Sequence, residues 1–321
     1  MHARRSITAG CAVAVTAILA FAAGSAGNAQ SQGTQPGADT NISYLRGQSV
    51  VPVYQGWTEN PDGTFDLHFS YINQNWAEEL DIPVGENNNI APAPYGPDAG
   101  QPTHFLPRQN RWQFTVRVPK DFGTTGPKEV IWTLTSHGRT HRAYGILEPG
   151  YAMTDFLIQF EFGGAAQEGR QPPKLAVDGE KQRTAKVGQP VPLVAVATDD
   201  GPPVRGRGFG ASRGNESPAE IPLGSVGGDF VRGTAGGLRL AWLVYRGAGR
   251  VTFDPPIPFK VWEDQRGGSP WAPGWQAPPI PPGNRWVHNV TFHQPGTYVL
   301  RAQAHTGQTF TNENITFVVT P

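Results

Sequence analysis

The sequence predicts an all-β protein built as two antiparallel β-sandwich domains in tandem. Short stretches in which apolar and polar residues alternate recur along the chain, and this alternation has the period of a half-buried strand. Clusters of Gly, Pro and Asn, which favour turns, separate these stretches. No segment carries a sustained apolar stripe with the 3.6-residue period of a helix. Many short strands joined by such turns are typical of a sandwich or barrel.

Residues 1–29 have the features of a secretory signal peptide. A basic start with two arginines is followed by residues 7–23, which are small or apolar and carry no charge. Gly27 and Ala29 stand at the two positions that a signal peptidase reads, so we expect the mature chain to begin near Gln30 in the periplasm or outside the cell. The alternative, a retained membrane anchor, is disfavoured because the apolar run is shorter than the roughly 20 residues that span a bilayer.

Composition argues against several classes of partner and site. The single cysteine, Cys11, lies within the predicted signal peptide, so we expect no disulfide and no thiolate metal site in the mature chain. Cys11 follows the basic start by about five residues, which is too few for the apolar stretch that lipidation requires. Removal of Arg4 and Arg5 leaves 24 basic against 26 acidic residues. This balance indicates neither nucleic acid nor an anionic membrane as a partner. We also expect no membrane insertion once the signal peptide is removed.

Four alternating stretches predict the strands of a first sandwich at residues 46–162, which follows a polar tail at residues 30–45. Within each stretch the apolar side chains are expected to share one face. These sets are Phe65, Leu67, Phe69 and Tyr71; Trp112, Phe114, Val116 and Val118; Val130, Trp132 and Leu134; and Phe156, Ile158, Phe160 and Phe162.

Residues 163–174 (GGAAQEGRQPPK) have the composition of a linker and no apolar pattern, so we place the domain boundary there. Alternation then resumes and predicts a second sandwich at residues 175–321. Its apolar sets are Leu193, Ala195 and Ala197; Leu238, Leu240, Trp242 and Val244; Tyr298, Leu300, Ala302 and Ala304; and Ile315, Phe317 and Val319.

The second half resembles an Ig-like domain of the PKD kind. Four pieces carry the resemblance: VGQPVPLVAVATDDG (187–201), LAWLVYRGAGRVTF (240–253), PGTYVLRAQAHTG (295–307) and the closing ENITFVVTP. Tyr298 follows a Pro-Gly turn, and we expect it to bury its ring while its hydroxyl reaches backbone at the sandwich corner. Two insertions, 202–237 and 255–285, interrupt the framework, and the Trp-x-Phe-Gly-Asp-Gly centre usual in PKD domains is absent. The resemblance implies a fold and no activity.

The whole chain also resembles a group of exported bacterial proteins of unassigned function. The recurring pieces are GWTENPDGTFDLHFSYINQN (56–75) and PTHFLP (102–107). This resemblance supplies no activity.

Patterns that imitate catalytic or metal sites lack the context that such sites need. Ser212 lies in a G-x-S-x-G pattern, but no apolar strand precedes it and no helix follows, as a nucleophile elbow requires. His137 and His141 are four residues apart but flank a predicted hairpin turn without a third ligand nearby. The oxygen-rich turns at 199–200 and 86–89 match no calcium loop. We therefore predict no catalytic residue, no metal and no cofactor.

The segment from Phe259 to Trp286 holds four tryptophans among six prolines. Trp271 and Trp275 are our candidate ligand-binding residues, because proline presents side chains on a semi-rigid extended strip and indoles stack on sugars or peptides. The alternative is that these indoles cap an open end of the sandwich. We predict a non-catalytic binding or structural protein for adhesion, scaffolding or accessory binding. Its expected partner is an unknown protein or polysaccharide of the cell envelope. The alternatives are a carbohydrate-binding protein that uses the Trp/Pro segment and a secreted hydrolase that uses Ser212.

Overall fold

A computed structural model of the chain describes residues 44–153, 171–199, 238–261, 278–306 and 309–321. The regular structure in these ranges is strand, apart from two 3-10 turns, η2 (Pro149–Tyr151) and η5 (Pro282–Asn284). Within the same ranges no helix is long and apolar enough to cross a membrane. The expected signal peptide, the strand expected at 156–162 and most of the expected linker lie outside the described residues, and β9 begins at Lys174, the last residue of that linker.

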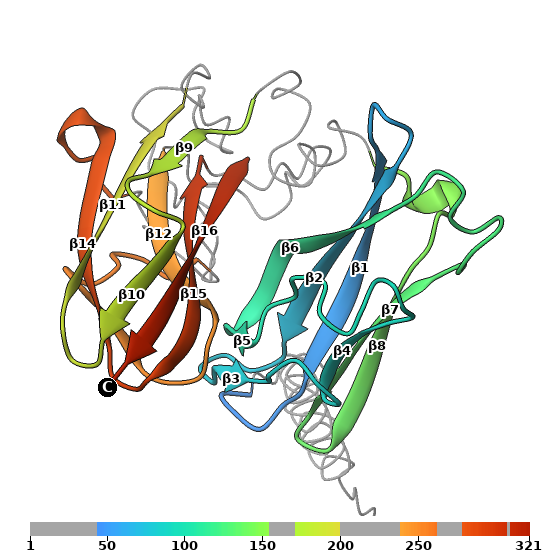
Figure 1. Cartoon of the computed structure of the whole chain (residues 1–321), viewed down its shortest axis with the longest axis horizontal. Helices are drawn as coiled ribbons and strands as arrows, with labels where there is room; N and C mark the ends of the chain where they lie inside the picture. The colour runs from blue at the N-terminus through green and yellow to red at the C-terminus, as the bar shows by residue number, and fades with distance from the viewer. Residues whose placement is uncertain (1–43, 154–170, 200–237, 262–277, 307–308) are drawn as a thin grey trace, which may run out of the picture. The chain divides into compact units, whose positions relative to one another are not determined.

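The N-terminal sandwich is formed by two three-stranded antiparallel sheets and one short strand pair. The first sheet has the order β1-β2-β6, the second has the order β4-β7-β8, and β3 pairs with β5 (Figure 1). Their bounds are β1 (Val50–Glu59), β2 (Phe65–Asn73), β3 (Leu80–Asp81), β4 (Asn88–Ala91), β5 (His104–Phe105), β6 (Arg108–Val118), β7 (Val130–Ser136) and β8 (Arg139–Gly145).

Aromatic side chains from three sheets form the core of this sandwich. Trp132 of β7 is fully buried, and its ring meets Phe114 edge-on with the ring centroids 4.9 Å apart. Phe69 stacks on Phe114 at 5.2 Å, and Tyr71 meets Phe105 edge-on at 4.9 Å. The alternation expected for β2 and β7 is confirmed, because Leu67, Phe69, Tyr71 and the three β7 residues Val130, Trp132 and Leu134 all lie in this core.

The alternation expected for β6 is wrong at Trp112. The register of β6 against β2 shifts between Phe69 and Tyr71, which marks a bulge, and Trp112 has a φ of 52°. Three residues of β6, Arg111 to Gln113, stand opposite the single residue Ser70 of β2, which breaks the strict alternation of faces at this point. The Trp112 ring therefore lies beside His68 at a centroid distance of 5.8 Å, whereas Phe114, Val116 and Val118 pack toward the core as expected.

The C-terminal sandwich has the strand order of an Ig-like domain. One sheet runs β10-β16-β15-β12 and the other β13-β14-β11-β9. In an Ig domain the first, second, fifth and fourth strands form one sheet in the order A-B-E-D, which β9-β11-β14-β13 reproduces, and the other sheet has the order C-F-G, which β12-β15-β16 reproduces with β10 added at its edge. Every pair is antiparallel except β10 with β16. The bounds are β9 (Lys174–Val177), β10 (Gln182–Lys186), β11 (Val191–Thr198), β12 (Arg239–Arg246), β13 (Val251–Asp254), β14 (Arg285–Phe292), β15 (Gly296–His305) and β16 (Phe310–Thr320). The predicted fold class is confirmed.

The core of the C-terminal sandwich uses the side chains that the alternation predicted. Leu193, Ala195 and Ala197 of β11, four residues of β15 from Tyr298 to Ala304 and three of β16 are buried there. The Phe292 ring lies 5.1 Å from Phe317 and 4.9 Å from Tyr298. Strand β12 departs from simple alternation because residues of both its faces are buried.

Candidate functional site

Strand β12 belongs to two apolar clusters at once. Leu240 and Trp242 enter the C-terminal core, whereas Ala241 and Leu243 point the other way and pack with Leu106 of the N-terminal sandwich and with Phe259. The inner face of a strand is buried in the core of its own sandwich. Its outer face can be buried only when another part of the molecule packs against it. We call this contact region, formed by residues 97–106 of the first sandwich with β12, residue 247 and Arg301 of the second, the junction.

Tyr245 is the central side chain of the junction. Its hydroxyl donates to the carbonyl oxygen of Gly100 at 2.6 Å, and its own carbonyl accepts from the N–H of Thr103 at 3.2 Å. The Arg301 guanidinium carbon lies 3.6 Å from the centre of the Tyr245 ring. Burial raises the pKa of the Tyr245 hydroxyl and lowers the pKa of Arg301. A cation over an aromatic face is attracted most strongly where water is excluded, and both side chains are buried here.

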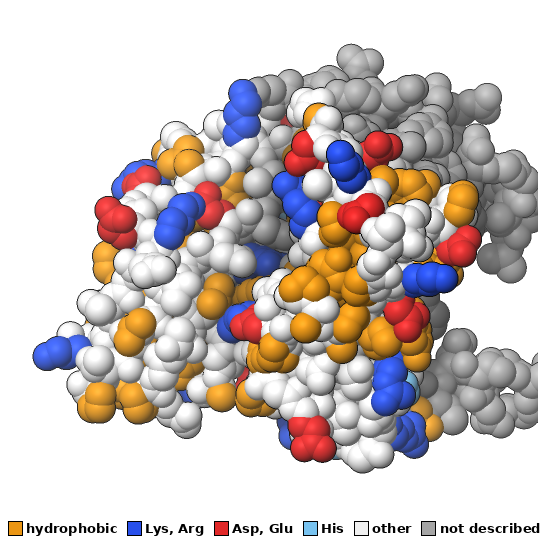
Figure 2. All heavy atoms as spheres, turned by 45° about the vertical axis from the view of Figure 1, so that its right-hand side comes forward, with side chains coloured by type: hydrophobic (Ala, Val, Ile, Leu, Met, Phe, Trp, Pro, Cys, Tyr) orange, Lys and Arg blue, Asp and Glu red, His pale blue; other side chains and the backbone are white. Residues whose placement is uncertain are grey.

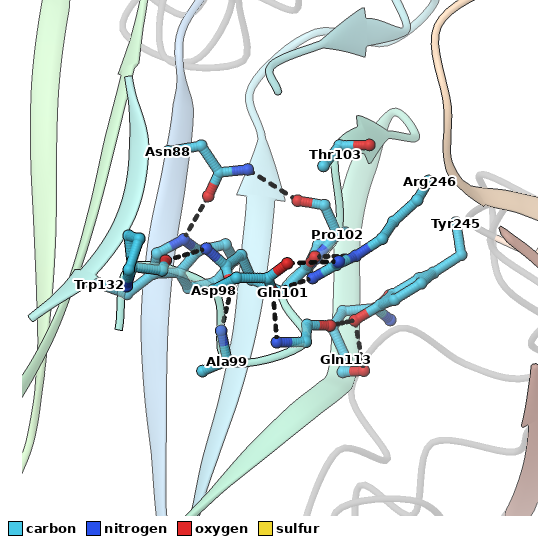
Figure 3. A network of polar contacts seen from close by, with 12 residues as sticks. Asn88, Asp98, Ala99, Gln101, Pro102, Thr103, Gln113, Trp132, Tyr245 and Arg246 are labelled. Atoms are coloured by element: carbon cyan, nitrogen blue, oxygen red, sulfur yellow. Dashed lines mark hydrogen bonds and ion pairs between the residues drawn. The ribbon is translucent and has the colours of Figure 1, made fainter. Parts of the chain in front are cut away.

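Arg246 adds a forked ion pair at the rim of the junction. Its two terminal nitrogens donate to the two carboxylate oxygens of Asp98 at 3.0 and 2.7 Å, and its Nε donates to the carbonyl of Gln101 at 2.7 Å (Figure 3). The hydrogen bond from Arg246 is the main reason that the pKa of Asp98 lies below its ordinary value. Such bidentate pairs fix orientation as well as distance.

Two buried amides hold the loop that carries Asp98. The Gln101 side chain accepts from the N–H of Ala99 at 2.8 Å and donates to the carbonyl of Pro97 at 2.9 Å. Asn88 donates to the carbonyl of Pro102 at 2.8 Å and accepts from the indole N–H of Trp132 at 3.0 Å (Figure 3). The loop is therefore tied to the aromatic core of the first sandwich before it meets Arg246.

A histidine between two carboxylates lies on β5, within the junction residues 97–106. His104 Nδ1 lies 2.8 Å from Asp81 Oδ1, and its Nε2 lies 3.2 Å from Glu79 Oε2. Burial by itself lowers the pKa of His104, but the hydrogen bonds and charges of the two carboxylates outweigh that effect and raise it to about 9. The imidazole is therefore protonated at neutral pH, and the cluster is an ion pair.

A small cavity of about 120 Å³ lies beside the junction, between β6 and the β15–β12 edge. Its lining includes Arg111, Arg239 and His305. Burial lowers the pKa of Arg239 to about 10 and, together with the nearby Arg239 charge, lowers the pKa of His305 to about 3. The volume is well below the roughly 300–1,000 Å³ of a small-molecule site, so this cavity suits water rather than a substrate.

Tyr298, the predicted structural corner, has a fully buried ring. Its hydroxyl lies 3.0 Å from the carbonyl oxygen of Gln294 and 3.1 Å from that of Ala248. A Cβ on Gly247 would lie 2.4 Å from Tyr298 Cδ1, and Gly247 has a φ of 124°, so only glycine fits against this ring. The backbone of the β12–β13 turn therefore packs directly against the Tyr298 ring.

The other candidate residues are not brought together. His137 and Gly138 form the turn of the β7–β8 hairpin, with φ values of 47° and 71° that suit a type I′ turn. His137 Nε2 lies 3.3 Å from Glu78 Oε1, whereas His141 Nε2 lies 2.9 Å from Ser49 Oγ. In the part of the chain that the structure describes, no group of three His, Cys, Asp or Glu side chains is arranged for a metal. Ser212, Trp271 and Trp275 lie outside the described residues.

Our sequence reasoning missed the junction, although one signal for it was present. Residues 240–245 (LAWLVY) are continuously apolar, which is typical of a strand buried on both faces. The polar partners Asp98, Gln101 and Arg301 carry no such signal, because each is an ordinary surface residue type that meets its partner only when the two sandwiches pack.

Comparisons with known proteins add little to the fold assignment, which is based on the strand order of the chain itself. No protein-family model matches, and a search of curated proteins finds no match. Among solved structures, the D00-D0 domain of Intimin is 9% identical, with 84% of this chain and 100% of that one covered and a TM-score of 0.22. The S-layer protein rSbsC is 9% identical over 85% of this chain and 28% of its own, and fibronectin(III)-like modules of Clostridium thermocellum CbhA are 8% identical over 84% and 94%, both with a TM-score of 0.22. Likeness this weak carries no argument about function.

Proposed function

We propose that the chain is an exported, non-catalytic binding or structural protein whose two sandwiches act as one rigid unit. The observation that carries the proposal is the junction, where Tyr245 and Arg246 of one sandwich are held by Gly100, Gln101 and Asp98 of the other. Export by the N-terminal signal and membership of the second sandwich in the PKD kind of Ig-like domain are parts of the same proposal.

The chemistry of the junction favours rigidity. The forked Arg246–Asp98 ion pair and the hydrogen bond of the Tyr245 hydroxyl constrain the two sandwiches at two separate points. The cluster that contains Leu106 and Leu243 adds buried apolar surface. Separation of the sandwiches would break the hydrogen bonds that the Tyr245 hydroxyl and Arg301 make to Gly100 and Gln113 of the first sandwich. Each such bond contributes a net stabilisation of about 0.5–1.5 kcal/mol, which opposes relative motion.

The same chemistry disfavours catalysis by these groups. A general base works best when its pKa lies near the working pH. His104 has a pKa raised to about 9 and is held in an ion pair, and His305 has a pKa of about 3 and stays neutral in its buried place. These side chains are locked in structural contacts rather than poised for proton transfer.

A rigid pair of sandwiches suits adhesion, spacing or presentation of loops. A fixed angle between two domains removes the entropy that a flexible pair would lose when both bind one partner. The proposed partner is a protein or polysaccharide of the cell envelope, with no nucleic acid and no membrane insertion.

The test is rotational diffusion of the full chain measured by NMR relaxation, with envelope binding measured in parallel. We expect one correlation time for both sandwiches and retention of the protein on isolated envelope fractions. The variant Tyr245→Phe/Arg246→Ala should give two correlation times and weaker retention. Its matched control, Tyr54→Phe/Arg285→Ala, loses equivalent bonds that each lie within one sandwich, from Tyr54 to Ile146 and from Arg285 to Asp178, and should behave as the unchanged protein. Independent tumbling of the unchanged sandwiches, or no retention, would contradict the proposal.

A further inference from the structure

The outer face of the β4-β7-β8 sheet forms a groove away from the junction. One hollow of about 510 Å³ is lined by residues of all three strands, and a second of about 360 Å³ continues it toward β3. The two hollows share Glu86, Asn87 and Thr135, so they form one groove. Strands β7 and β8 lie at the right of Figure 1, the side that turns forward in Figure 2, where hydrophobic side chains and charges of both signs are interspersed.

Strand register arranges the groove in rows across the sheet. Ile131 of β7 pairs with Ala91 on one side and Tyr144 on the other, which makes an apolar row. The next row is polar, because Thr133 pairs with Asn89 and Arg142 in the same way. Cross-strand partners point to the same face and lie within contact distance.

A third row completes the floor with hydroxyl groups. Thr135 and Thr140 are cross-strand partners whose hydroxyl oxygens lie 2.8 Å apart. Asn87 lies beside them, since its carbonyl accepts from the N–H of Thr135 at 2.8 Å. The floor is therefore one apolar row next to two rows of amides and hydroxyls.

The polar side chains of the groove have hydrogen-bonding capacity to spare. Across the described ranges, the side chains of Asn87, Asn89, Thr133 and Arg142 make no hydrogen bond to another protein group, and Thr135 and Thr140 bond only each other. An amide offers two donors and an acceptor, and a hydroxyl offers both roles. A ligand with many hydroxyl groups can satisfy this mixture.

Charge narrows the class of ligand further. Glu86 and Arg142 line the first hollow with opposite signs, and Asp81, which lines the second, is paired with the protonated His104. The groove therefore carries no field that selects an anion or a cation.

Tyr144 is not one of the residues that line the hollow, but as the cross-strand partner of Ile131 it lies on the same face at the edge of the groove. It is 47% exposed there and offers an aromatic face. Aromatic rings present an apolar body beside polar partners, which matches the C–H face and the hydroxyl rim of a sugar.

We propose that this groove binds a neutral oligosaccharide, with Tyr144 as the stacking platform and Asn89, Thr133 and Arg142 as hydrogen-bonding partners. The inference rests on the proposed binding function and names a ligand class and a site for it. It moves carbohydrate recognition from the Trp/Pro segment to the outer face of the first sandwich.

The test is affinity gel electrophoresis of the full chain through a neutral β-1,3-glucan, a neutral α-glucan, a neutral mannan and the anionic polygalacturonate. We expect at least one neutral polymer to retard the protein and the anionic polymer not to be preferred. Tyr144→Ala should weaken retardation about tenfold, the upper range for one lost aromatic contact. Asn89→Ala/Thr133→Ala should weaken it as well.

Tyr151→Ala is the matched control, since Tyr151 is 48% exposed but lies in η2, whereas Tyr144 is the cross-strand partner of the groove residue Ile131. The inference fails if no neutral polymer retards the protein, if only polygalacturonate does, or if Tyr151→Ala loses as much affinity as Tyr144→Ala. It also fails if Trp271→Ala/Trp275→Ala abolishes retardation while Tyr144→Ala does not. Retention on envelope fractions with a single correlation time, but without glycan binding, would remove this inference and leave the proposed function standing.

Discussion

The outer faces of strands β7 and β12 differ sharply, although both strands place alternate side chains in a core. On β7 the outward residues Ile131, Thr133 and Thr135 are half-buried, and two of the three are hydroxylated. On β12 the outward Ala241, Leu243 and Tyr245 are buried. The first face borders a groove, whereas the second is covered by the other sandwich.

This difference shows that the residue types on the outer face of a strand indicate whether another part of the protein covers that face. Apolar surface is buried because removal from water stabilises the fold by about 25 cal/mol per Å². A face that stays in water gains nothing from large apolar residues, and polar ones remain there at no cost. The outer row of β12 therefore indicates an internal partner, and that of β7 indicates a surface open to an external one.

The largest expected effect compares Leu243→Ala with Ile131→Ala. Leu243→Ala removes a side chain buried in the junction cluster and should lower the free energy of unfolding by about 2–4 kcal/mol. Ile131→Ala changes a half-buried residue on the groove and should cost less than about 1 kcal/mol. Urea denaturation of both variants measures the two values. Equal losses of unfolding free energy in the two variants would contradict the expected difference between the two outer faces.

The pH dependence of stability should show how much the protonated His104 contributes at the edge of the junction. The pKa of His104 is raised to about 9 from its ordinary 6.5, so the folded state binds a proton more tightly than the unfolded state. The resulting stability is complete below about pH 6.5 and is lost as the pH rises to about 9.

We expect this loss to be about 1–2 kcal/mol, reduced by solvent screening because Glu79 and Asp81 are partly exposed. Denaturation between pH 6 and pH 9.5 measures it. His104→Gln should flatten the profile over this window, and a variant with the same slope as the unchanged protein would show that another group is responsible.

Tyr298→Phe should have a smaller effect that stays within one sandwich. The change keeps the buried ring and removes the hydroxyl that reaches the Gln294 and Ala248 carbonyls. The C-terminal sandwich should lose about 1 kcal/mol, the net contribution of one buried hydrogen bond. Hydrogen exchange resolved by residue separates the two sandwiches. Equal destabilisation of the N-terminal sandwich would contradict this prediction and would mean that the two halves unfold together, either through the junction or because the boundary at residues 163–174 is wrong.

Treatment with EDTA should have no effect on the melting temperature, which makes it the smallest of the expected effects. A ligand bound only to the folded state at one hundred times its Kd would add about 2.7 kcal/mol of stability. We expect the melting temperature to stay unchanged when the chelator is added. A fall of several degrees would reveal a metal site and contradict the prediction.

Sequence reasoning predicted the strands wherever local alternation decides the face. Leu67 and Phe69 of β2, Trp132 of β7 and Leu300 of β15 are buried as the period of two requires. It failed at Trp112, because a bulge at residues 111–113 breaks the alternation of faces and no residue type in that stretch indicates one. The candidate site was predictable only in its apolar part, the unbroken LAWLVY of β12.

The sequence by itself determined the all-β class, the alternating faces and the Pro-Gly turn before Tyr298, because these depend on residues close together in the chain. Only the tertiary structure decided that Asp98 meets Arg246, that Arg301 lies over Tyr245, and that the rows of β4, β7 and β8 line up. The physical reason is that such contacts join residues far apart in sequence. Their partners are chosen by how whole sheets pack and register, which no local pattern encodes.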